Sequence, residues 1–214
     1  MHRPAKPQPA DQDTRGRLLD AAIRLFAEAG FKRVTVRAIC RAARANVAAV
    51  NYHFRDKLGL YREVTEAAIA MMQETTDLAA AAAVGRTPEE QLRAYVTVVT
   101  ERLVGPSSHE WVHRFIAREM IDPTPALSSL VDRGMRPRLD HLAEIIGGLL
   151  NLPPDHPQVV ACVTSVHAQI LLFRSNPITQ RLRAKTKTAP ASPAEIAAHI
   201  ATFSLAGIRA VPAV

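Results

Sequence analysis

The residues with the clearest chemical potential lie between Thr35 and Lys57, in the segment TVRAICRAARANVAAVNYHFRDK. The small side chains of Ala48 and Ala49 would let a helix approach a DNA groove closely, and they could touch thymine methyl groups. Asn51 carries the amide that can bond adenine N6 and N7 together. An exposed helix bearing these side chains could therefore read base edges in the major groove.

Polar and basic side chains around this group could bind the DNA backbone. Tyr52, His53 and Lys57 lie at the far end of the same segment, where phosphate contacts would fix the register on the duplex. Thr35, at a helix start, offers a hydroxyl and free backbone N–H groups to another phosphate. The full set of expected DNA contacts is Arg15, Thr35, Arg37, Arg44, Asn46, Ala48, Ala49, Asn51, Tyr52, His53 and Lys57, with Arg17 and Arg41 adding positive charge.

Each of these residues also has a simpler explanation. Tyr52 could be a core aromatic residue with a solvated hydroxyl, and Asn51 could be a solvated surface amide. The arginines could form an ordinary charged surface. The order of the residues along the chain, rather than any one of them, carries the DNA-binding interpretation.

Two short helices are expected to position these side chains. Thr35 is a suitable N-cap for the first, a turn follows at residues 44–46, and Asn46 can cap the second. The side chains expected to face the core are Val36, Ile39, Cys40 and Ala43 in the first helix, and Val47, Val50 and Phe54 in the second. This succession of cap, helix, turn, cap and helix is the outline of a helix-turn-helix.

The charge distribution agrees with this interpretation. Residues 1–57 contain 12 Lys and Arg against 5 Asp and Glu, whereas residues 58–214 contain 15 of each. The formal net charge of +7 therefore lies on the segment that carries the motif. A basic segment could also meet an anionic membrane or an acidic protein, so the motif decides between partners and the charge does not.

The rest of the chain predicts an all-α protein of about nine helices. Apolar residues make up 48% of the sequence with Ala prominent among them, and aromatic residues only 5%, which favours helices. We expect a flexible basic arm at 1–13, a helix-turn-helix domain at 14–58, and a helical domain at 59–214. Thr14 is the expected start of the first helix and Gly30 its end. One long helix is expected over 126–150.

Composition also bears on the compartment of the protein. The two cysteines, Cys40 and Cys162, have apolar neighbours and indicate small core residues rather than a disulfide framework. No apolar run is long enough to span a membrane, and the polar, proline-rich start is unlike a signal peptide. We therefore expect a cytoplasmic protein that binds no membrane.

The segment DTRGRLLDAAIRLFAEAGFKRVTVRAICRAARANVAAVNYHFRDKLGLYREV resembles the DNA-binding domain of TetR-family transcriptional regulators. That family has Thr or Ser at the position of Thr35. It also has a Tyr/His-x-Phe-x-x-Lys pattern, where Tyr52, His53, Phe54 and Lys57 stand in this sequence. The chain departs from the family in having Arg44 where glycine is usual in the turn, and Asn46 rather than Ser as the cap. Asn caps helices well, so neither departure breaks the resemblance.

The C-terminal half resembles the CecR-like branch of the same family, through HEWVHRFIAREMIDPTPAL and VHAQILLFRSNP. The resemblance implies a homodimer built on residues 159–173 and 194–208, an inverted-repeat operator on double-stranded DNA, and repression relieved by a small-molecule effector. Ligand binding among the helices of residues 60–173 would move the long helix expected to start near Lys57, and so change the separation of the two DNA-reading helices of the dimer. Residues that could line the effector pocket are Met71, Trp111, His113, Phe115, Met120 and His167, although their spacing is equally compatible with core or interface packing.

A literal His-Glu-x-x-His, at His109, Glu110 and His113, offers an alternative as a zinc-dependent hydrolase. Such a site needs a third protein ligand, and only the unremarkable Asp132, His141 and Glu144 are available. We therefore interpret the motif as incidental and expect no metal, no cofactor and no enzymatic activity. A basic helical adaptor that binds only proteins is the third function class.

Overall fold

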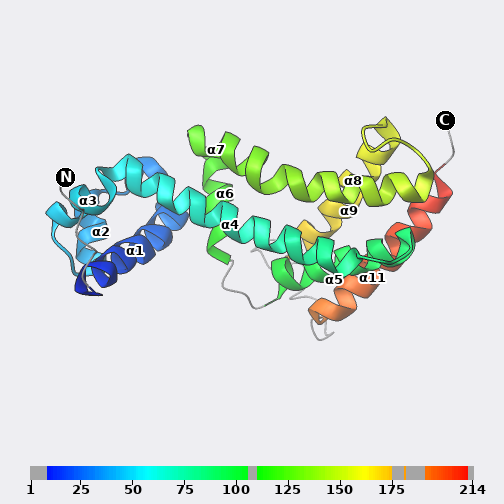
Figure 1. The fold of residues 1–214 in the computed structure, drawn as a ribbon, viewed down its shortest axis with the longest axis horizontal. Coiled ribbons are helices and arrows are strands. Elements are labelled where there is room, and N and C mark those ends of the chain that lie inside the picture. Colours follow the sequence, from blue (N-terminus) through cyan, green and yellow to red (C-terminus); the bar gives the residue numbers. More distant parts are fainter. Residues whose placement is uncertain (1–8, 106–109, 175–180, 182–190, 212–214) are drawn as a thin grey trace, which may run out of the picture. The chain divides into compact units, whose positions relative to one another are not determined.

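The computed structural model describes residues 9–105, 110–174, 181 and 191–211, and these residues form helices joined by short turns with no strand among them. The all-α prediction is confirmed (Figure 1). The helices are α1 (Pro9–Arg33), α2 (Val36–Ala43), α3 (Val47–Phe54), α4 (Lys57–Ala83), α5 (Pro88–Val104), α6 (Glu110–Ile121), α7 (Pro125–Ser129), the π-helical segment η1 (Leu130–Met135), α8 (Arg136–Leu150), α9 (Pro157–Phe173) and α11 (Pro193–Ala210). With the continuous run from α7 to α8 taken once, this part of the chain has nine helical runs, as expected.

The chain packs as two compact units. Unit 1 contains Met1–Ala70 and Glu110–Val131, and unit 2 contains Met71–His109 and Asp132–Val214. Helix α6 therefore packs in the same unit as the helix-turn-helix, although it begins 56 residues after the end of α3. The functional domains expected from the sequence, 14–58 and 59–214, divide the chain differently and stay a prediction.

An aromatic cluster forms the centre of unit 1. The Tyr61 ring of α4 lies 4.8 Å from Phe26 of α1, in an edge-to-face arrangement, and 5.2 Å from Phe115 of α6. Phe26 and Phe115 are fully buried. Phe31 and Trp111 extend the cluster on either side. Aromatic residues bury large areas, so this cluster holds α1, α4 and α6 together, alongside buried aliphatic residues such as Leu18, Leu60 and Val112.

A buried carboxylate reinforces this packing. Glu119 of α6 is 1% exposed and accepts a hydrogen bond from the Tyr61 hydroxyl. Its other oxygen accepts from the backbone N–H of Thr124 at 3.0 Å and from the Thr124 hydroxyl at 2.9 Å. Burial and the hydrogen bond to Glu119 raise the pKa of Tyr61 well above its usual range. Thr124 also caps α7, so one carboxylate connects α4, α6 and α7.

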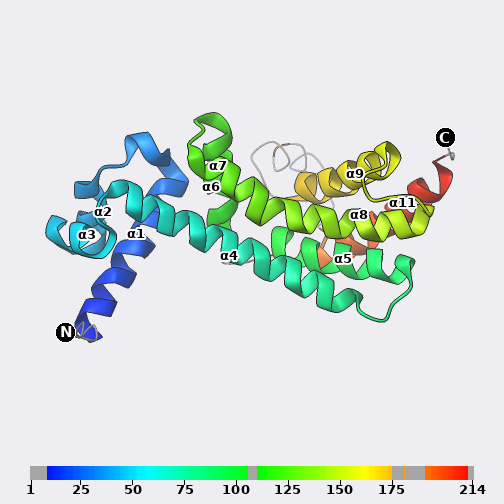
Figure 2. The same cartoon turned by 45° about the horizontal axis from the view of Figure 1, so that its top comes forward.

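Unit 2 is a helical bundle in which α5, α8, α9 and α11 surround an aliphatic core (Figure 2). Its fully buried members include Leu92, Tyr95, Leu142 and Ile170. Capping boxes begin α5 at Thr87 and α11 at Ser192, each with proline in the first turn. These signals define where both helices start, because they satisfy backbone N–H groups that otherwise lack partners.

Two details of the predicted helices differ from the structure. Helix α1 begins at Pro9 rather than at Thr14, because proline suits the first turn of a helix, where its missing N–H is not needed. The arm expected at 1–13 is therefore helical from Pro9, and residues 1–8 lie outside the described residues. Gly30 interrupts α1 with φ of 76°, as expected for a helix stop, although helical structure continues to Arg33.

The helix expected over 126–150 contains a π-helical segment at η1. Gly134 is buried there, and a β-carbon on it would lie 2.8 Å from the sulfur of Met72 on α4. The side chain of Gln73 also donates to the Arg133 carbonyl at 3.3 Å. Glycine thus permits a close approach of α4 and η1 that the apolar periodicity of the sequence does not reveal.

No helix within the described ranges combines the length and the apolar character needed to cross a membrane.

Candidate nucleic-acid interface

The turn between α2 and α3 has the geometry of a helix-turn-helix. Thr35 caps α2, since its hydroxyl accepts from the Ala38 N–H at 3.1 Å, and Asn46 caps α3 by accepting from the Ala48 N–H at 3.1 Å. Arg44 takes the left-handed conformation with φ of 52°, and the Ala45 N–H returns to the Cys40 carbonyl at 2.9 Å. This hydrogen bond closes the end of α2. Both predicted caps and the turn at 44–46 are confirmed.

Helix α3 has one buried and one exposed face. Val50 and Phe54 are buried, as expected, whereas Ala48 and Asn51 are exposed and Ala49 is partly exposed. Tyr52 is 75% exposed, so the alternative that it is a core residue is wrong. Small and hydrogen-bonding side chains therefore share a surface that could enter a groove.

Val47 does not follow the prediction that it points inward. It is 41% exposed, because it is the first residue of α3 and no following element covers the start of the helix. The core of the helix-turn-helix therefore uses Val50 and Phe54 of α3 against Ile39, Cys40 and Ala43 of α2.

At the junction between α3 and α4, Lys57 lies against Phe31 of α1. The Lys57 ammonium lies 4.3 Å from the centroid of the Phe31 ring, and partial burial lowers the pKa of this lysine. Asp56 begins α4 by accepting from the Gly59 N–H at 2.7 Å. A β-carbon on Gly59 would lie 1.9 Å from the Phe54 carbonyl oxygen, so only glycine allows this turn. We did not anticipate Asp56 and Gly59 from the sequence, although Asp three residues before Gly was a visible capping signal.

The arginines of the DNA-binding head, which consists of α1, α2 and α3, divide into two groups. Arg15 pairs with Glu63 at 2.5 Å and lies 5.2 Å from the centroid of the Phe54 ring, while Arg17 donates to the Ala43 carbonyl at 3.2 Å. These two side chains connect α1 to α4, α3 and α2, so their roles are at least partly structural. Arg37, Arg41 and Arg44 are exposed on α2 and the turn, where they remain available to phosphates.

The residues suggested as a ligand pocket do not form one group. Phe115 is fully buried in the aromatic core of unit 1, and Trp111 lies beside it with ring centroids 6.3 Å apart. Met120 is 72% exposed, so it does not line an enclosed cavity; it follows the inward-facing Glu119 by one residue, about 100° around the helix. His113 is partly buried in the same unit. Met71 and His167 are partly buried and belong to unit 2.

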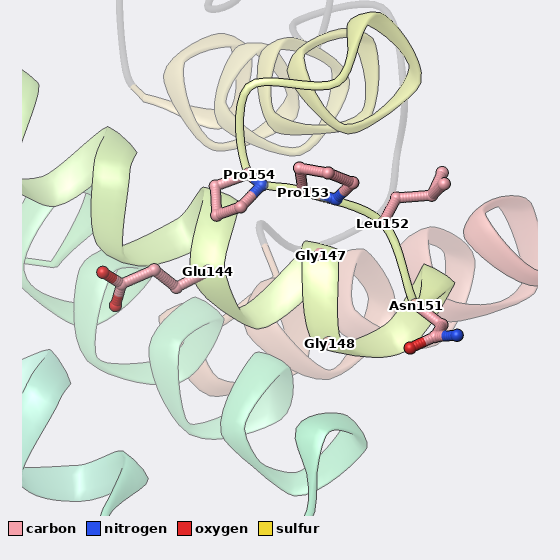
Figure 3. A pocket seen from close by; sticks show the side chains of 7 residues that line it. All are labelled: Glu144, Gly147, Gly148, Asn151, Leu152, Pro153 and Pro154. Carbon is pink, nitrogen blue, oxygen red and sulfur yellow. The ribbon is translucent and has the colours of Figure 1, made fainter.

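A hollow of about 470 Å³ in unit 2 opens to solvent at the end of α8 (Figure 3). It is lined by Glu144, Gly147, Gly148, Asn151, Leu152, Pro153 and Pro154. None of the six suggested pocket residues lines it. Four of its seven lining residues, 151–154, belong to the turn before α9, and only Glu144 and Asn151 among the seven have polar side chains to offer a ligand.

The His-Glu-x-x-His motif gains no support from the structure. His109 lies outside the described residues, and Glu110 and His113 lie in the first turn of α6. Glu110 pairs with Arg114 at 3.0 Å. Within the ranges that the structure describes, no group of three or more His, Cys, Asp or Glu side chains is placed to hold a metal ion.

Comparison with known families agrees with this geometry. Residues 18–64 match the family described as bacterial regulatory proteins of the tetR family, and residues 88–208 match the C-terminal domain of the HTH-type transcriptional dual regulator CecR. The matched families and the helix-turn-helix define the class of the protein as a transcriptional regulator. The chain belongs to the TetR family of regulators, and its C-terminal domain is of the CecR type.

Curated relatives are similar over part of their length. The chain is 30% identical over 112 residues to the "Probable HTH-type transcriptional regulator YttP" of Bacillus subtilis, a match that covers 52% of this chain and 53% of YttP. It is 38% identical over 55 residues to the HTH-type transcriptional regulator AcrR of Shigella flexneri, covering 26% of each protein. The chain thus spans about half or less of the curated relatives that it matches.

Solved structures share the fold over nearly the whole chain. A TetR-like transcriptional regulator from Rhodococcus sp. RHA1 superposes with a TM-score of 0.67 at 16% identity, covering 97% of this chain and 100% of the other. The ketosteroid transcriptional regulator KstR2 of Mycobacterium tuberculosis gives a TM-score of 0.61 at 17% identity, covering 95% and 98%. At these identities the similarity shows the fold alone.

Proposed function

We propose that the protein is a cytoplasmic repressor that binds an inverted-repeat operator as a homodimer and releases it when a small molecule binds. The main support for DNA binding is the exposed face of α3, where Ala48, Asn51 and Tyr52 lie beside exposed basic residues. Asn51 would bond an adenine, and Tyr52, His53 and Lys57 would bond phosphates. Thr35, Arg37 and Arg44 would hold the backbone on the other side of the turn.

The outer faces of α9 and α11 support the homodimer. Exposed residues on α9 recur along one face and carry no charge: Val160, Ala161, Thr164, Ser165, Ala168, Leu171 and Leu172. Leu172 is 67% exposed, and Phe203 on α11 is 63% exposed. The two helices pack together, with Gln169 of α9 donating to the Ser204 hydroxyl of α11 at 3.2 Å. An uncharged, partly apolar surface on two adjacent helices is typical of a dimer interface.

The small residues of α11 are not all available to a partner helix. Ala197, Ala201 and Ser204 are small enough to allow close approach of another helix, but all are at most 5% exposed. They lie on the face of α11 that packs against α5 and α9 of the same chain. The partner would therefore meet the neighbouring face, which includes Phe203 and Gly207.

The two-fold symmetry of a dimer predicts the symmetry of the operator. One recognition helix reads few bases, so a dimer with a two-fold axis would read the same half-site twice in opposite orientations. The half-sites would lie one helical turn of DNA, about 34 Å, or a multiple of it apart. Effector binding in the region 59–214 would change that separation, and an effector acts only through its differential affinity for the two states.

Fluorescence anisotropy with duplex DNA from upstream of this protein's own gene tests the operator. The wild type, Asn51→Ala, Tyr52→Ala and the control Arg93→Ala, an exposed arginine of α5, are titrated at two salt concentrations with excess random competitor. Binding that survives competitor, weakens with salt, and is lost in the first two variants but not in the control is expected. Equal loss in Arg93→Ala would mean that only general positive charge is involved. Scrambling one half-site separates an inverted repeat from a single site, and transcription from the same template in vitro separates repression from activation.

Sedimentation equilibrium tests the dimer. Leu172→Glu should convert the protein to a monomer at micromolar concentration, while Leu78→Glu, at a 45% exposed leucine of α4, should leave the dimer intact. A wild-type monomer at that concentration would refute the dimer and, with it, the inverted repeat.

A further inference from the structure

A buried arginine in unit 2 lacks a counter-charge. Arg138 of α8 is 5% exposed, and its Nε has no hydrogen-bond partner. Burial lowers its pKa, but an arginine side chain stays protonated in proteins. Burying an unpaired guanidinium is strongly unfavourable, so such a group usually has an anionic partner when the protein functions.

The described side chains supply no such partner. Among residues 13–105, 110–174, 181 and 191–211, no carboxylate forms an ion pair with Arg138. Asp11 is the one Asp or Glu of the sequence outside these ranges. One neighbour of Arg138 is the neutral Tyr95 of α5, whose hydroxyl donates to the Arg138 carbonyl at 3.4 Å.

Other polar atoms in the same part of the bundle are also buried without partners. They are His167 Nδ1 on α9, His141 Nε2 on α8 and Thr100 Oγ1 on α5. Burial and the positive charge of Arg138 lower the pKa of His167 to about 4, so this imidazole is neutral near pH 7 and lies within the field of the guanidinium. Helices α5, α8 and α9, which carry these groups, pack against one another in pairs (Figures 1 and 2).

The core that α5, α8 and α9 share is mainly apolar. Leu142 of α8, Val99 of α5, and Val166 and Ile170 of α9 are at most 1% exposed and belong to the same core. A molecule that reached Arg138 would place most of its surface against such side chains. Binding sites of this kind orient a mainly apolar ligand through a few polar groups.

We propose that Arg138 anchors the anionic group of the effector, which is therefore a small carboxylic acid with an apolar body bound among α5, α8 and α9. A carboxylate matches the guanidinium fork with two parallel hydrogen bonds, and the neutral His167, which lies within the field of Arg138, can complete its coordination. The inference rests on the proposed response to a small molecule, and it specifies the chemical class of that molecule. Binding relieves the unfavourable burial of a free charge, so the acid stabilises the fold as well.

Thermal unfolding of the full chain tests the ligand class. The probes are octanoate, phenylbutyrate and naphthoate, each compared with its primary amide at equal ionic strength. The acids are used at about 10 mM, where a site with a Kd of about 1 mM is largely filled. We expect at least one acid to raise the unfolding midpoint while its amide does not. Equal shifts with acid and amide, or no shift with any acid, would overturn the proposal.

Variants locate the site. Arg138→Met replaces the buried charge with an apolar side chain of similar length, so the protein should fold at least as stably as the wild type and bind the acid about tenfold more weakly or worse. Arg138→Lys keeps a charge without the fork and should bind with intermediate affinity. The matched control is Arg136→Met, an exposed arginine of the same helix, which should bind as the wild type does. Wild-type binding in Arg138→Met, or strong destabilisation of that variant without ligand, would refute an anchoring role.

Operator affinity, measured separately with and without the acid, distinguishes the two proposals. An acid that binds through Arg138 but leaves operator affinity unchanged would refute ligand-induced release and keep the anion site. Specific operator binding by a protein whose unfolding midpoint no acid raises would keep the DNA-binding proposal and refute the anion site.

Discussion

Replacing Glu119 with glutamine tests how strongly α6 and α7 are held to α4 in unit 1. The carboxylate is 1% exposed and accepts from the Tyr61 hydroxyl, and from Thr124 at 3.0 and 2.9 Å. Glutamine has the same shape but only one acceptor oxygen, so its amide nitrogen must face a donor on one side. Hydrogen bonds to charged groups each contribute about 1.5–3 kcal/mol, so the substitution should destabilise the protein by about 2–4 kcal/mol.

A double-mutant cycle isolates the Tyr61–Glu119 hydrogen bond. Tyr61→Phe removes only the hydroxyl and should cost about 1–3 kcal/mol, because the charged partner stays buried. With Glu119→Gln already present, Tyr61→Phe should cost less by about 1 kcal/mol or more. Urea unfolding followed by circular dichroism at constant protein concentration gives the four free energies, since dimerisation would make stability depend on concentration.

Glu28→Gln is the matched control, because Glu28 is exposed on α1 in the same unit. It should change stability by no more than about 0.5 kcal/mol. Additive effects of Tyr61→Phe and Glu119→Gln would refute the reasoning, since they would mean that the buried carboxylate does not hold Tyr61.

Other predictions follow from single residues. Thr35→Ala should cost about 1 kcal/mol in urea unfolding, because it removes the acceptor 3.1 Å from the Ala38 N–H, and Thr35→Ser should restore stability. Arg44→Gly should stabilise the head by about 1 kcal/mol, because φ is 52° there, while it lowers the salt dependence of operator binding by about one phosphate contact. The pKa of His167 is about 4 in the folded protein and about 6.5 in the unfolded chain, so the unfolded chain takes up this proton at higher pH. The free energy of unfolding should therefore fall by at most about 3 kcal/mol as pH drops from about 6.5 to 4. In His167→Gln that part of the pH dependence should be absent; an unchanged curve would contradict it.

Much of the helix-turn-helix could be predicted because its determinants are local. Caps at Thr35 and Asn46 act on N–H groups two or three residues away, and the turn follows from a short interval between two apolar faces. The exposed positions of Asn51 and Tyr52 then follow from helical periodicity alone. The prediction that Val47 faces the core was wrong, because periodicity gives the direction of a side chain but does not show whether another element covers it.

The sequence by itself determined the all-α class, the turn at residues 44–46 and the excess of positive charge on the head. Tertiary structure alone placed α6 with the head, because the apolar stripe of a helix does not identify its partner. It likewise paired Arg15 with Glu63, and turned Ala197 and Ala201 toward the helices of their own chain. It also buried Arg138 without a counter-charge, which a sequence cannot reveal, since an arginine on an amphipathic helix is ordinarily solvated. Contacts between residues far apart in the chain depend on how several helices pack at once, and local propensities do not contain that information.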